Sequence, residues 1–272
     1  MKDSTKEKVK KITEQLEQGV QDLFSSEKYA EYLRFVGKFH RYSANNCLLI
    51  AMQMPEASMV AGFKKWQELG RFVKKGSKGI AILAPIQRKF MKEVENEKGE
   101  KTEEEVKYLA FMPTYVFDVS QTDGAELPGI CEDLTGDAEE ELIEKVISIS
   151  PVPVQFGKVP GKAKGFFHKD GYIVIREGMS GQQTLKTLVH EIAHSILHCK
   201  GGEEEKTTGE TKEVQAESTA YAVCSYFGID TSDYSFGYVA GWSSGKEVKE
   251  LQASLDVIQK TASSMIEQIE AA

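Results

Sequence analysis

Apolar residues recur every three or four positions near the start of the chain, and this spacing predicts an amphipathic helix over residues 6–24. Two serines interrupt the pattern, and a second helix is predicted over 27–42. A third is predicted over 44–54. It ends before Pro55, because proline disfavours a helical conformation at the preceding residue. A short helix is expected over 63–69, so the chain opens with helices.

The pattern changes after residue 70. Glycines at turn positions precede a β-rich run at 80–83, and residues 108–120 are also predicted to form a strand. The segment between them, residues 92–107, is too polar to bury and is interpreted as the tip of a long hairpin or as a mobile insert. The first half of the chain is therefore predicted to be helices followed by a small sheet.

Glycine, proline and acidic residues mix over residues 121–137, which we interpret as a connecting region. The turn at 168–171 joins two of the strands predicted after it into a hairpin. The elements predicted beyond this region are a helix (138–150), short strands (152–156, 163–168 and 172–177), two helices (182–199 and 210–227) and a long amphipathic helix from Lys246 to the end.

A length of 272 residues suggests two domains at roughly 100–200 residues per domain. We expect an α+β protein with a first domain over 1–122, a linker over 123–134 and a second domain over 135–272. No apolar run approaches the roughly 18 residues of a membrane helix, and the first segment lacks the apolar core of a secretory signal. The cysteines occur singly, which favours the reducing cytoplasm.

The net charge of −8, from 34 basic and 42 acidic residues, taken alone argues against a nucleic-acid partner. The charge is unevenly spread, however. Residues 34–92 hold twelve lysines and arginines but only Glu56 and Glu68 as acids, so this block carries +10 and the remainder −18. Aromatic residues are interleaved with the bases. This mixture suits single-stranded nucleic acid, because lysine and arginine side chains neutralise phosphates and aromatic rings stack on unpaired nucleobases. The alternative is a solvated basic face over an aromatic core.

The nucleic-acid-binding residues that we expect all lie in this basic block. Those from 71 to 78 are expected to contact phosphates, and Trp66 or Tyr42 to stack on a base, although Trp66 suits a core position equally well. The full set is Arg41, Lys64, Lys65, Trp66, Arg71, Lys74, Lys75 and Lys78.

Residues 190–194 read His-Glu-Ile-Ala-His, the H-E-x-x-H pattern. Residues four apart share one face of a helix, so His190 and His194 can bind one metal ion. Glu191 stands beside them, where it can take a proton from a metal-bound water. A separate apolar stripe on the same helix predicts that its polar face borders a cleft. The pattern therefore indicates a zinc site for peptide hydrolysis, with Glu191 as the general base.

Zinc in such a site needs a third protein ligand, with the fourth position left to water. Leu197 and Lys200 stand where the longer metzincin pattern has Gly and His, which excludes that scheme. Glu213 and Glu217 lie one helical turn apart, so one can bind the metal while the other steadies a ligand histidine. Their spacing resembles the gluzincin arrangement, in which the first acid is the ligand. We expect Glu213 as ligand and Glu217 as its support; the reverse assignment and a solvated helix face remain alternatives.

Two regions resemble ArdC-type antirestriction proteins. Residues 39–86 carry an Arg-Tyr-Ser segment, a Gly-Phe-x-x-Trp helix and a basic turn like the N-terminal domain of that family, and residues 116–128 extend the likeness. Residues 190–198 and 212–229 are similar to its metallopeptidase-like domain and to the ImmA/IrrE zincins. The resemblance covers roughly residues 25–230.

The resemblance implies a helical plus small-sheet domain that binds single-stranded DNA, joined to a zincin-like metallopeptidase domain. Such proteins are commonly encoded on plasmids or conjugative elements. We therefore expect a protein that binds single-stranded DNA, protects or processes incoming DNA, and acts with Zn on a peptide or protein. Two alternatives stay open. In the first, the zincin domain is structural or binds a protein partner without cleaving it. In the second, the protein is an ordinary zinc peptidase whose basic block recruits acidic protein partners.

Overall fold

The computed structural model describes residues 3–24, 26–95, 101–127, 137–198 and 207–272. The opening helices are confirmed as α1 (Asp3–Leu23), α2 (Ser26–Lys38) and α3 (Ala44–Gln53). Helix α2 ends four residues earlier than predicted, because the chain turns over the next residues to begin α3. Ser43 caps that helix by accepting a hydrogen bond from the amide of Asn46 at 3.3 Å.

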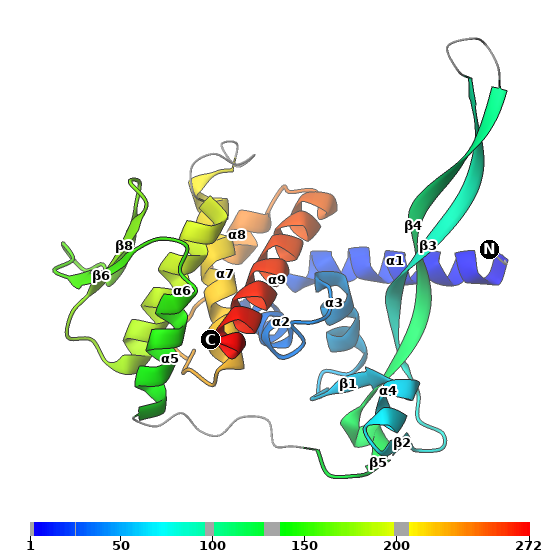
Figure 1. The fold of residues 1–272 in the computed structure, drawn as a ribbon, viewed down its shortest axis with the longest axis horizontal. Helices are drawn as coiled ribbons and strands as arrows, with labels where there is room; N and C mark the ends of the chain where they lie inside the picture. Colours follow the sequence, from blue (N-terminus) through cyan, green and yellow to red (C-terminus); the bar gives the residue numbers. More distant parts are fainter. Residues whose placement is uncertain (1–2, 25, 96–100, 128–136, 199–206) are drawn as a thin grey trace.

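A long antiparallel hairpin dominates the next part of the chain. It consists of β3 (Ile80–Glu95) and β4 (Lys101–Asp118), and it extends away from the helices (Figure 1). The predicted hairpin is confirmed, but its strands are longer than predicted, since 92–95 and 101–107 are paired strand residues; residues 96–100 lie outside the described residues. The remaining elements here are β1 (Val60–Gly62), α4 (Phe63–Glu68), β2 (Arg71–Val73), the short 3-10 helix η1 (Val119–Gln121) and β5 (Thr122–Gly124).

The base of the hairpin is fixed on both sides. Strand β1 pairs with β4, giving the sheet order β1-β4-β3. On the other edge, side chains of α3 replace a neighbouring strand. The amide of Asn46 exchanges two hydrogen bonds with the backbone of Leu83, and Gln53 does the same with Ala81, all at 2.9–3.0 Å. These side-chain amides satisfy backbone groups that an open sheet edge would leave unpaired.

The second half begins with α5 (Asp137–Ser148) and a three-stranded sheet in the order β6-β8-β7. Strand β7 (Gly165–His168) lies at an edge and is antiparallel to β8 (Tyr172–Arg176), whereas β6 (Val154–Gly157) runs parallel to β8. The helices that follow are α6 (Gly181–His198), α7 (Gly209–Tyr226), the short α8 (Val239–Ser243) and α9 (Val248–Ala271). All the predicted elements of this half are confirmed, and α8 is an addition to them.

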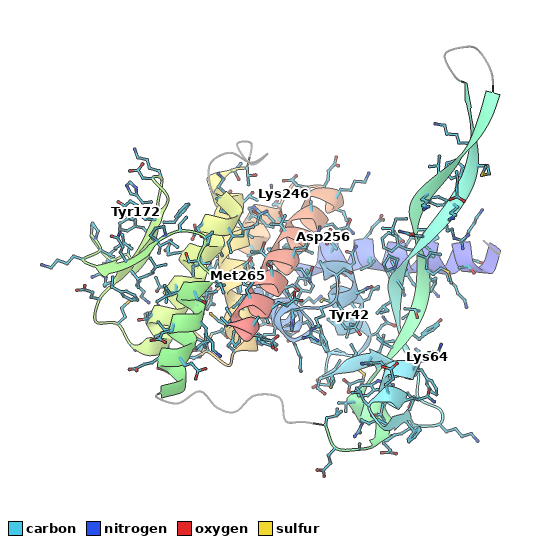
Figure 2. The ribbon with its side chains drawn as sticks, viewed as in Figure 1. Tyr42, Lys64, Tyr172, Lys246, Asp256 and Met265 are labelled. Carbon is cyan, nitrogen blue, oxygen red and sulfur yellow. The ribbon has the colours of Figure 1, made fainter. Side chains whose placement is uncertain are left out.

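The hydrophobic core runs through both halves of the chain. Helix α2 packs directly against α7, and α9 packs against α7 and against the N-terminal helices α1, α2 and α3 (Figure 1). The hydroxyl groups of Tyr29 and Ser218 lie 2.9 Å apart, and Gln259 donates to the carbonyl of His40 at 2.7 Å. Figure 2 shows the buried Met265 within this helical layer, between Tyr172 on one side and Lys64 on the other. The α+β fold class is confirmed; the boundaries 1–122, 123–134 and 135–272 stay a prediction.

Among the described helices, none combines the length and apolar character needed to cross a membrane.

Candidate functional site

Helices α6 and α7 pack side by side and carry the predicted metal-binding residues on facing surfaces. In the apolar stripe of α6, Leu185, Leu188 and Ile192 are fully buried and fix the rotation of the helix, whereas Ile196 near its end is 41% exposed. His190 and His194 therefore point to the opposite side, one turn apart. Glu213 approaches them from α7, so two elements that are separate in the sequence complete one site.

The three side chains place their donor atoms close together. The Nε2 atoms of His190 and His194 lie 3.1 Å apart, and each lies 3.3 Å from a different carboxylate oxygen of Glu213. Zinc bonded at about 2.0–2.2 Å to tetrahedral ligands requires ligand atoms about 3.3–3.6 Å apart. Two imidazoles and a carboxylate at this spacing therefore fit a divalent metal ion.

The charges of the site favour an anionic Glu213. Hydrogen bonds with His190 and His194 hold the pKa of Glu213 far below its usual range. Burial by itself lowers the pKa of His190, but the hydrogen bond with Glu213 and the neighbouring carboxylates outweigh it, so that pKa is raised. A metal ion would take the place of these protons, because it binds neutral imidazole and ionised carboxylate.

Glu191 and the predicted metal-binding residues line one cavity of about 630 Å³. Burial raises the pKa of Glu191, and the backbone amide of Phe167 in β7 donates a hydrogen bond to its carboxylate. Edge strand β7 thus lies along the same cavity as the predicted general base. The carboxylate is both desolvated and held in place, as a proton-accepting group beside a metal-bound water needs to be.

Glu217 also lines the cavity, and its partner is a residue that sequence reasoning missed. The Tyr238 hydroxyl donates to the carboxylate of Glu217 from the start of α8. Burial raises the pKa of Glu217, and burial together with this carboxylate raises the pKa of Tyr238. Tyr238 lies 21 residues beyond Glu217 in an irregular segment, and no spacing rule in the sequence signals the contact.

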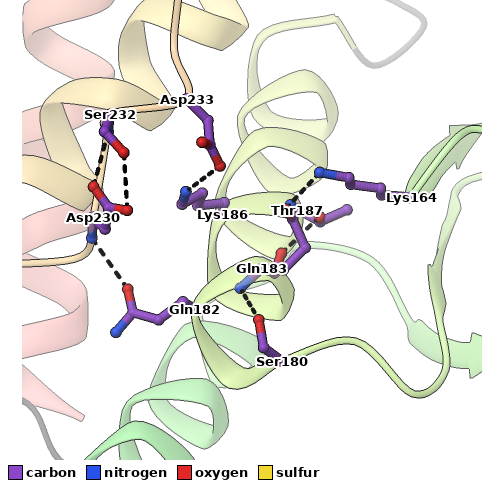
Figure 3. A network of polar contacts seen from close by, with 9 residues as sticks. All are labelled: Lys164, Ser180, Gln182, Gln183, Lys186, Thr187, Asp230, Ser232 and Asp233. Carbon is purple, nitrogen blue, oxygen red and sulfur yellow. Dashed lines mark hydrogen bonds and ion pairs between the residues drawn. The ribbon is translucent and has the colours of Figure 1, made fainter.

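A polar network fixes the end of the cavity next to α6 (Figure 3). Lys186, almost fully buried, donates to Asp233 at 3.1 Å, and Gln182 accepts from the amide of Asp230. Lys164, in the segment before β7, donates to Gln183. The network ties the loop at 230–233 and the segment before β7 to the same helix that carries His190.

Other histidines and tyrosines of the C-terminal half have structural partners. His198 lies 3.1 Å from the carbonyl oxygen of Lys212, which ties the end of α6 to α7. His168 stacks on Tyr172, and its Nδ1 atom accepts a hydrogen bond from a turn amide. Tyr221 is buried among aromatic rings.

The basic residues predicted to contact DNA are mostly exposed. Lys64, Lys65, Lys74, Lys75 and Lys78 all reach solvent, although Lys65 pairs with Glu68 and Lys74 with Asp123.

Two arginines in the predicted DNA-binding set have protein partners. Arg71 donates to the side chain and carbonyl of Thr122 and to the carbonyl of Ala125, so it fastens β2 to β5. Arg41 is exposed and lies 4.0 Å from Glu270 of α9.

Trp66 requires a correction. It is fully buried, with 0% of its surface exposed, and its indole N–H donates to the carbonyl of Phe117 at 2.8 Å. The alternative that Trp66 belongs to the core is therefore the right one, and no face of the ring is open to a base. Its burial follows from its place on α4, which packs between β1, β2 and β4.

Two family models match the chain in sequence order. The N-terminal domain of anti-restriction factor ArdC matches residues 2–117, and the IrrE N-terminal-like domain matches residues 145–236. Together they define a protein that joins an ArdC N-terminal domain to an IrrE-like peptidase-family domain. The chain thus contains both domains of the ArdC-type architecture, and the predicted resemblance to ArdC-type proteins is confirmed.

One relative aligns with almost the whole of this chain. The chain is 27% identical over 312 aligned positions to the uncharacterized protein pXO2-81 of Bacillus anthracis, an alignment that includes 99% of this chain. It covers 52% of that protein, so the chain spans about half the length of the curated relative it matches.

Solved structures of an antirestriction ArdC protein from plasmid R388 are also similar. The metal-free form is 19% identical, with a TM-score of 0.47 and 84% of each chain covered. The Mn(II)-bound form is 17% identical, with a TM-score of 0.48, and covers 85% of this chain and 84% of its own.

Proposed function

We propose that the protein binds single-stranded DNA through its N-terminal half and hydrolyses peptide bonds at a zinc site in its C-terminal half. The observation that carries the second part is the convergence of two imidazoles and one carboxylate at 3.1–3.3 Å beside a desolvated glutamate. This is the donor set of gluzincin peptidases, with His190, His194 and Glu213 as ligands.

Each residue of the site has a distinct task. Zinc, when bound, supplies Lewis-acid activation of a water molecule and of the scissile carbonyl. Glu191 accepts the proton of the attacking water and passes it to the leaving amine. Glu217, held by Tyr238, supports the ligand set through its negative charge near His190.

The peptide substrate is proposed to lie along β7. Among the described strands β7 pairs with β8 alone, and residues of β7 and Glu191 line the same cavity. An extended peptide that adds to the free edge gains main-chain hydrogen bonds and brings its carbonyl groups past the site. Phe166 and Phe167 line the same cavity and offer apolar contact to substrate side chains.

The DNA-binding part of the proposal rests on the polarised charge. The exposed lysines of the +10 block suit phosphate contacts, and the family match extends over this part of the chain. We propose that binding serves the protection or processing of DNA that enters a cell with a mobile element. Such contacts predict affinity that falls steeply with salt and depends little on sequence.

The test combines metal, cleavage and DNA measurements on the full chain. Zinc is quantified in protein purified without added metal, and cleavage of a random peptide library is followed by mass spectrometry. Glu191→Gln is expected to retain about one zinc per chain and to lose cleavage, whereas His194→Ala loses both. Purified wild type without zinc, or Glu191→Gln with unchanged cleavage, contradicts the peptidase proposal.

One alternative predicts a different outcome. If the site only binds a protein partner or stabilises the fold, Glu191→Gln leaves protection of incoming single-stranded plasmid DNA intact in a conjugation assay. Where Glu191→Gln keeps protection, His194→Ala in the same assay tests for a structural metal, because losing a metal that the fold needs abolishes protection.

A further inference from the structure

One face of the β3–β4 hairpin exposes apolar side chains where an antiparallel sheet ordinarily exposes polar ones. Alternate residues of a strand point to opposite faces. At the base of the hairpin, Ile80, Ile82 and Val116 point into the core shared with α1 and α3. The opposite, solvent-facing positions of β4 are Leu109, Phe111 and Tyr115, which are 61%, 48% and 51% exposed.

This exposed row continues onto the rest of the domain. Phe117 follows on the same face of β4, and its ring lies 6.5 Å from that of Phe63 in α4, which is itself half exposed. We name the row the ladder and define it by its residues, Leu109, Phe111, Tyr115, Phe117 and Phe63. It is a line of mainly aromatic side chains.

Small residues on β3 leave the rings of the ladder open. Pro85 pairs with Phe111 and Ala81 pairs with Tyr115. Gly79, the residue immediately before β3, has no side chain. A Cβ atom there would lie 3.0 Å from the Cβ of Tyr115 and 3.2 Å from the ring of Phe117, so any larger residue would displace these side chains. About half of the surface of Phe111 and of Tyr115 therefore remains accessible to a ligand.

We propose that the ladder is the surface on which the unpaired bases of single-stranded DNA stack. Residues two apart in a strand are spaced about 6.8 Å, so each ring can meet a different base of an extended strand. Base–aromatic stacking tolerates any sequence, because every base has a π-face. The proposal rests on the proposed DNA-binding function and moves its stacking role from the buried Trp66 to exposed rings.

The charge around the ladder supports an anionic occupant. Lys107 follows on the same face of β4, Lys64 adjoins Phe63, and Lys78 adjoins Gly79. None of these three lysines has an ion-pair partner among the residues that the structure describes, whereas Lys89 pairs with Glu105 at 2.9 Å. Figure 2 shows Lys64 beside the base of the hairpin. Free lysines along both ends of an aromatic row suit a chain of phosphates with unpaired bases.

A second copy of the chain fits this face less well. A symmetric dimer places the same patch on both sides of the interface, and would bring the uncompensated lysines of one copy toward those of the other. Like charges brought together at an interface oppose association. Self-association is therefore an outcome that the experiment must detect, and we do not expect it.

The test measures fluorescence anisotropy of a labelled 20-nucleotide oligodeoxythymidine with the full-length protein. Phe111→Leu/Tyr115→Leu keeps apolar side chains but removes the π-faces, and we expect its affinity to fall about tenfold or more. The matched control is Phe90→Leu/Tyr108→Leu. These two rings are comparably exposed on the same hairpin but lie on its other face, and their loss is expected to change affinity less than twofold.

Salt dependence separates stacking from phosphate contacts. Phe111→Leu/Tyr115→Leu is expected to keep the wild-type slope of log affinity against log salt, because no charge is removed. Lys78→Gln/Lys107→Gln is expected to reduce that slope by about 1.4, at roughly 0.7 for each phosphate contact on a single strand. Circular dichroism and thermal melting check that all variants are folded.

Three outcomes overturn the proposal, and they are distinguishable. If wild type binds and the Phe111→Leu/Tyr115→Leu variant binds equally well, the ladder is wrong while DNA binding stands. If wild type binds no single-stranded DNA at low salt, the proposed DNA-binding function fails with it. Light scattering tests for a dimer. If wild type is a dimer, if Phe111→Leu/Tyr115→Leu is a monomer, and if DNA does not dissociate the wild-type dimer, the ladder serves self-association.

Discussion

The hydroxyl of Tyr238 donates a hydrogen bond to the carboxylate of Glu217, and this contact joins the start of α8 to the cavity lined by the H-E-x-x-H residues. It holds Glu217 in a fixed position next to the proposed metal ligands. Glu213, one turn earlier on α7, faces the two histidines directly. The two carboxylates thus have different partners although they lie only one helical turn apart.

Tyr238→Phe is expected to weaken zinc binding about tenfold. Removing the hydroxyl leaves Glu217 without the donor that orients it, and loss of such supporting contacts typically costs 10–100-fold in metal affinity. Competition with a chromophoric chelator measures the change. Tyr172→Phe serves as control, since Tyr172 stacks on His168 and is expected to leave affinity unchanged. Equal zinc affinity in Tyr238→Phe and wild type would contradict a supporting role.

In zinc-free protein, the contribution of the Glu213–His190 contact to the free energy of unfolding is expected to depend on pH. Glu213 has a depressed pKa, so its contribution is present above about pH 4.3 and is lost as pH falls further. His190 has a raised pKa, so its contribution is present below about pH 6.5 and is lost as pH rises through the folded value. The contact therefore stabilises most between about pH 4.5 and 6.5.

Thermal melting of zinc-free wild type and Glu213→Gln checks this window. We expect the difference in Tm to be largest near pH 5.5 and to shrink towards pH 8.5. The Glu213 side chain is 56% exposed, so screening by solvent limits the effect to about 1 kcal/mol or less, a few degrees in Tm. A difference that grows with pH would show that the variant acts through another interaction. Zinc binding has the opposite dependence and strengthens as His190 loses its proton.

Asp118→Ala is expected to destabilise the protein by about 3 kcal/mol. The carboxylate is buried and accepts backbone hydrogen bonds from Ser58, Met59 and Ser120 at 2.7–3.0 Å. Burial opposes ionisation, but these donors outweigh it and the pKa of Asp118 is lowered. Truncation leaves buried amides without an acceptor, which accounts for the cost. Urea denaturation measures it, with the exposed Asp123→Ala as a control expected to change stability by less than about 0.5 kcal/mol.

Asn46→Leu is expected to open the edge of β3. The side chain of Asn46 supplies both a donor and an acceptor to Leu83, and leucine can supply neither. We expect a loss of about 2 kcal/mol and a greater tendency to aggregate, because unpaired edge groups recruit other strands. Denaturation and light scattering over time measure these effects. A variant as stable and as monodisperse as wild type would show that water replaces the side chain at no cost.

Helix positions and the histidines of the candidate metal site were the most predictable features. The 3.6-residue periodicity located α1, α6 and α9 because each helix buries one continuous face. The i, i+4 spacing of His190 and His194 predicted that both side chains lie on one face of a single helix. Glu213 was harder, since its partnership with them depends on how α7 packs against α6. The spacing of the two acids limited the candidates for the third ligand to Glu213 and Glu217. The packing of α7 on α6 brings Glu213 to the histidines.

Exposure was the least predictable property. Trp66 and Phe111 are both aromatic residues near lysines in the sequence, yet Trp66 is buried and Phe111 is half exposed. Nothing in their local pattern distinguishes them, because burial depends on which elements cover a face after folding. Tyr238 was missed for a similar reason, as its contact with Glu217 crosses an irregular segment.

The amino-acid sequence by itself determined the order of helices and strands, the segregation of positive charge into residues 34–92, and the paired histidines of the H-E-x-x-H pattern. These features are local, since periodicity, charge and i, i+4 spacing act within one element. The tertiary structure alone decided that α2 shares a core with α7 and α9, that Tyr238 holds Glu217, and that the ladder of the β3–β4 hairpin faces solvent. Each of these depends on contacts between elements far apart in the chain, and only the folded packing brings those elements together.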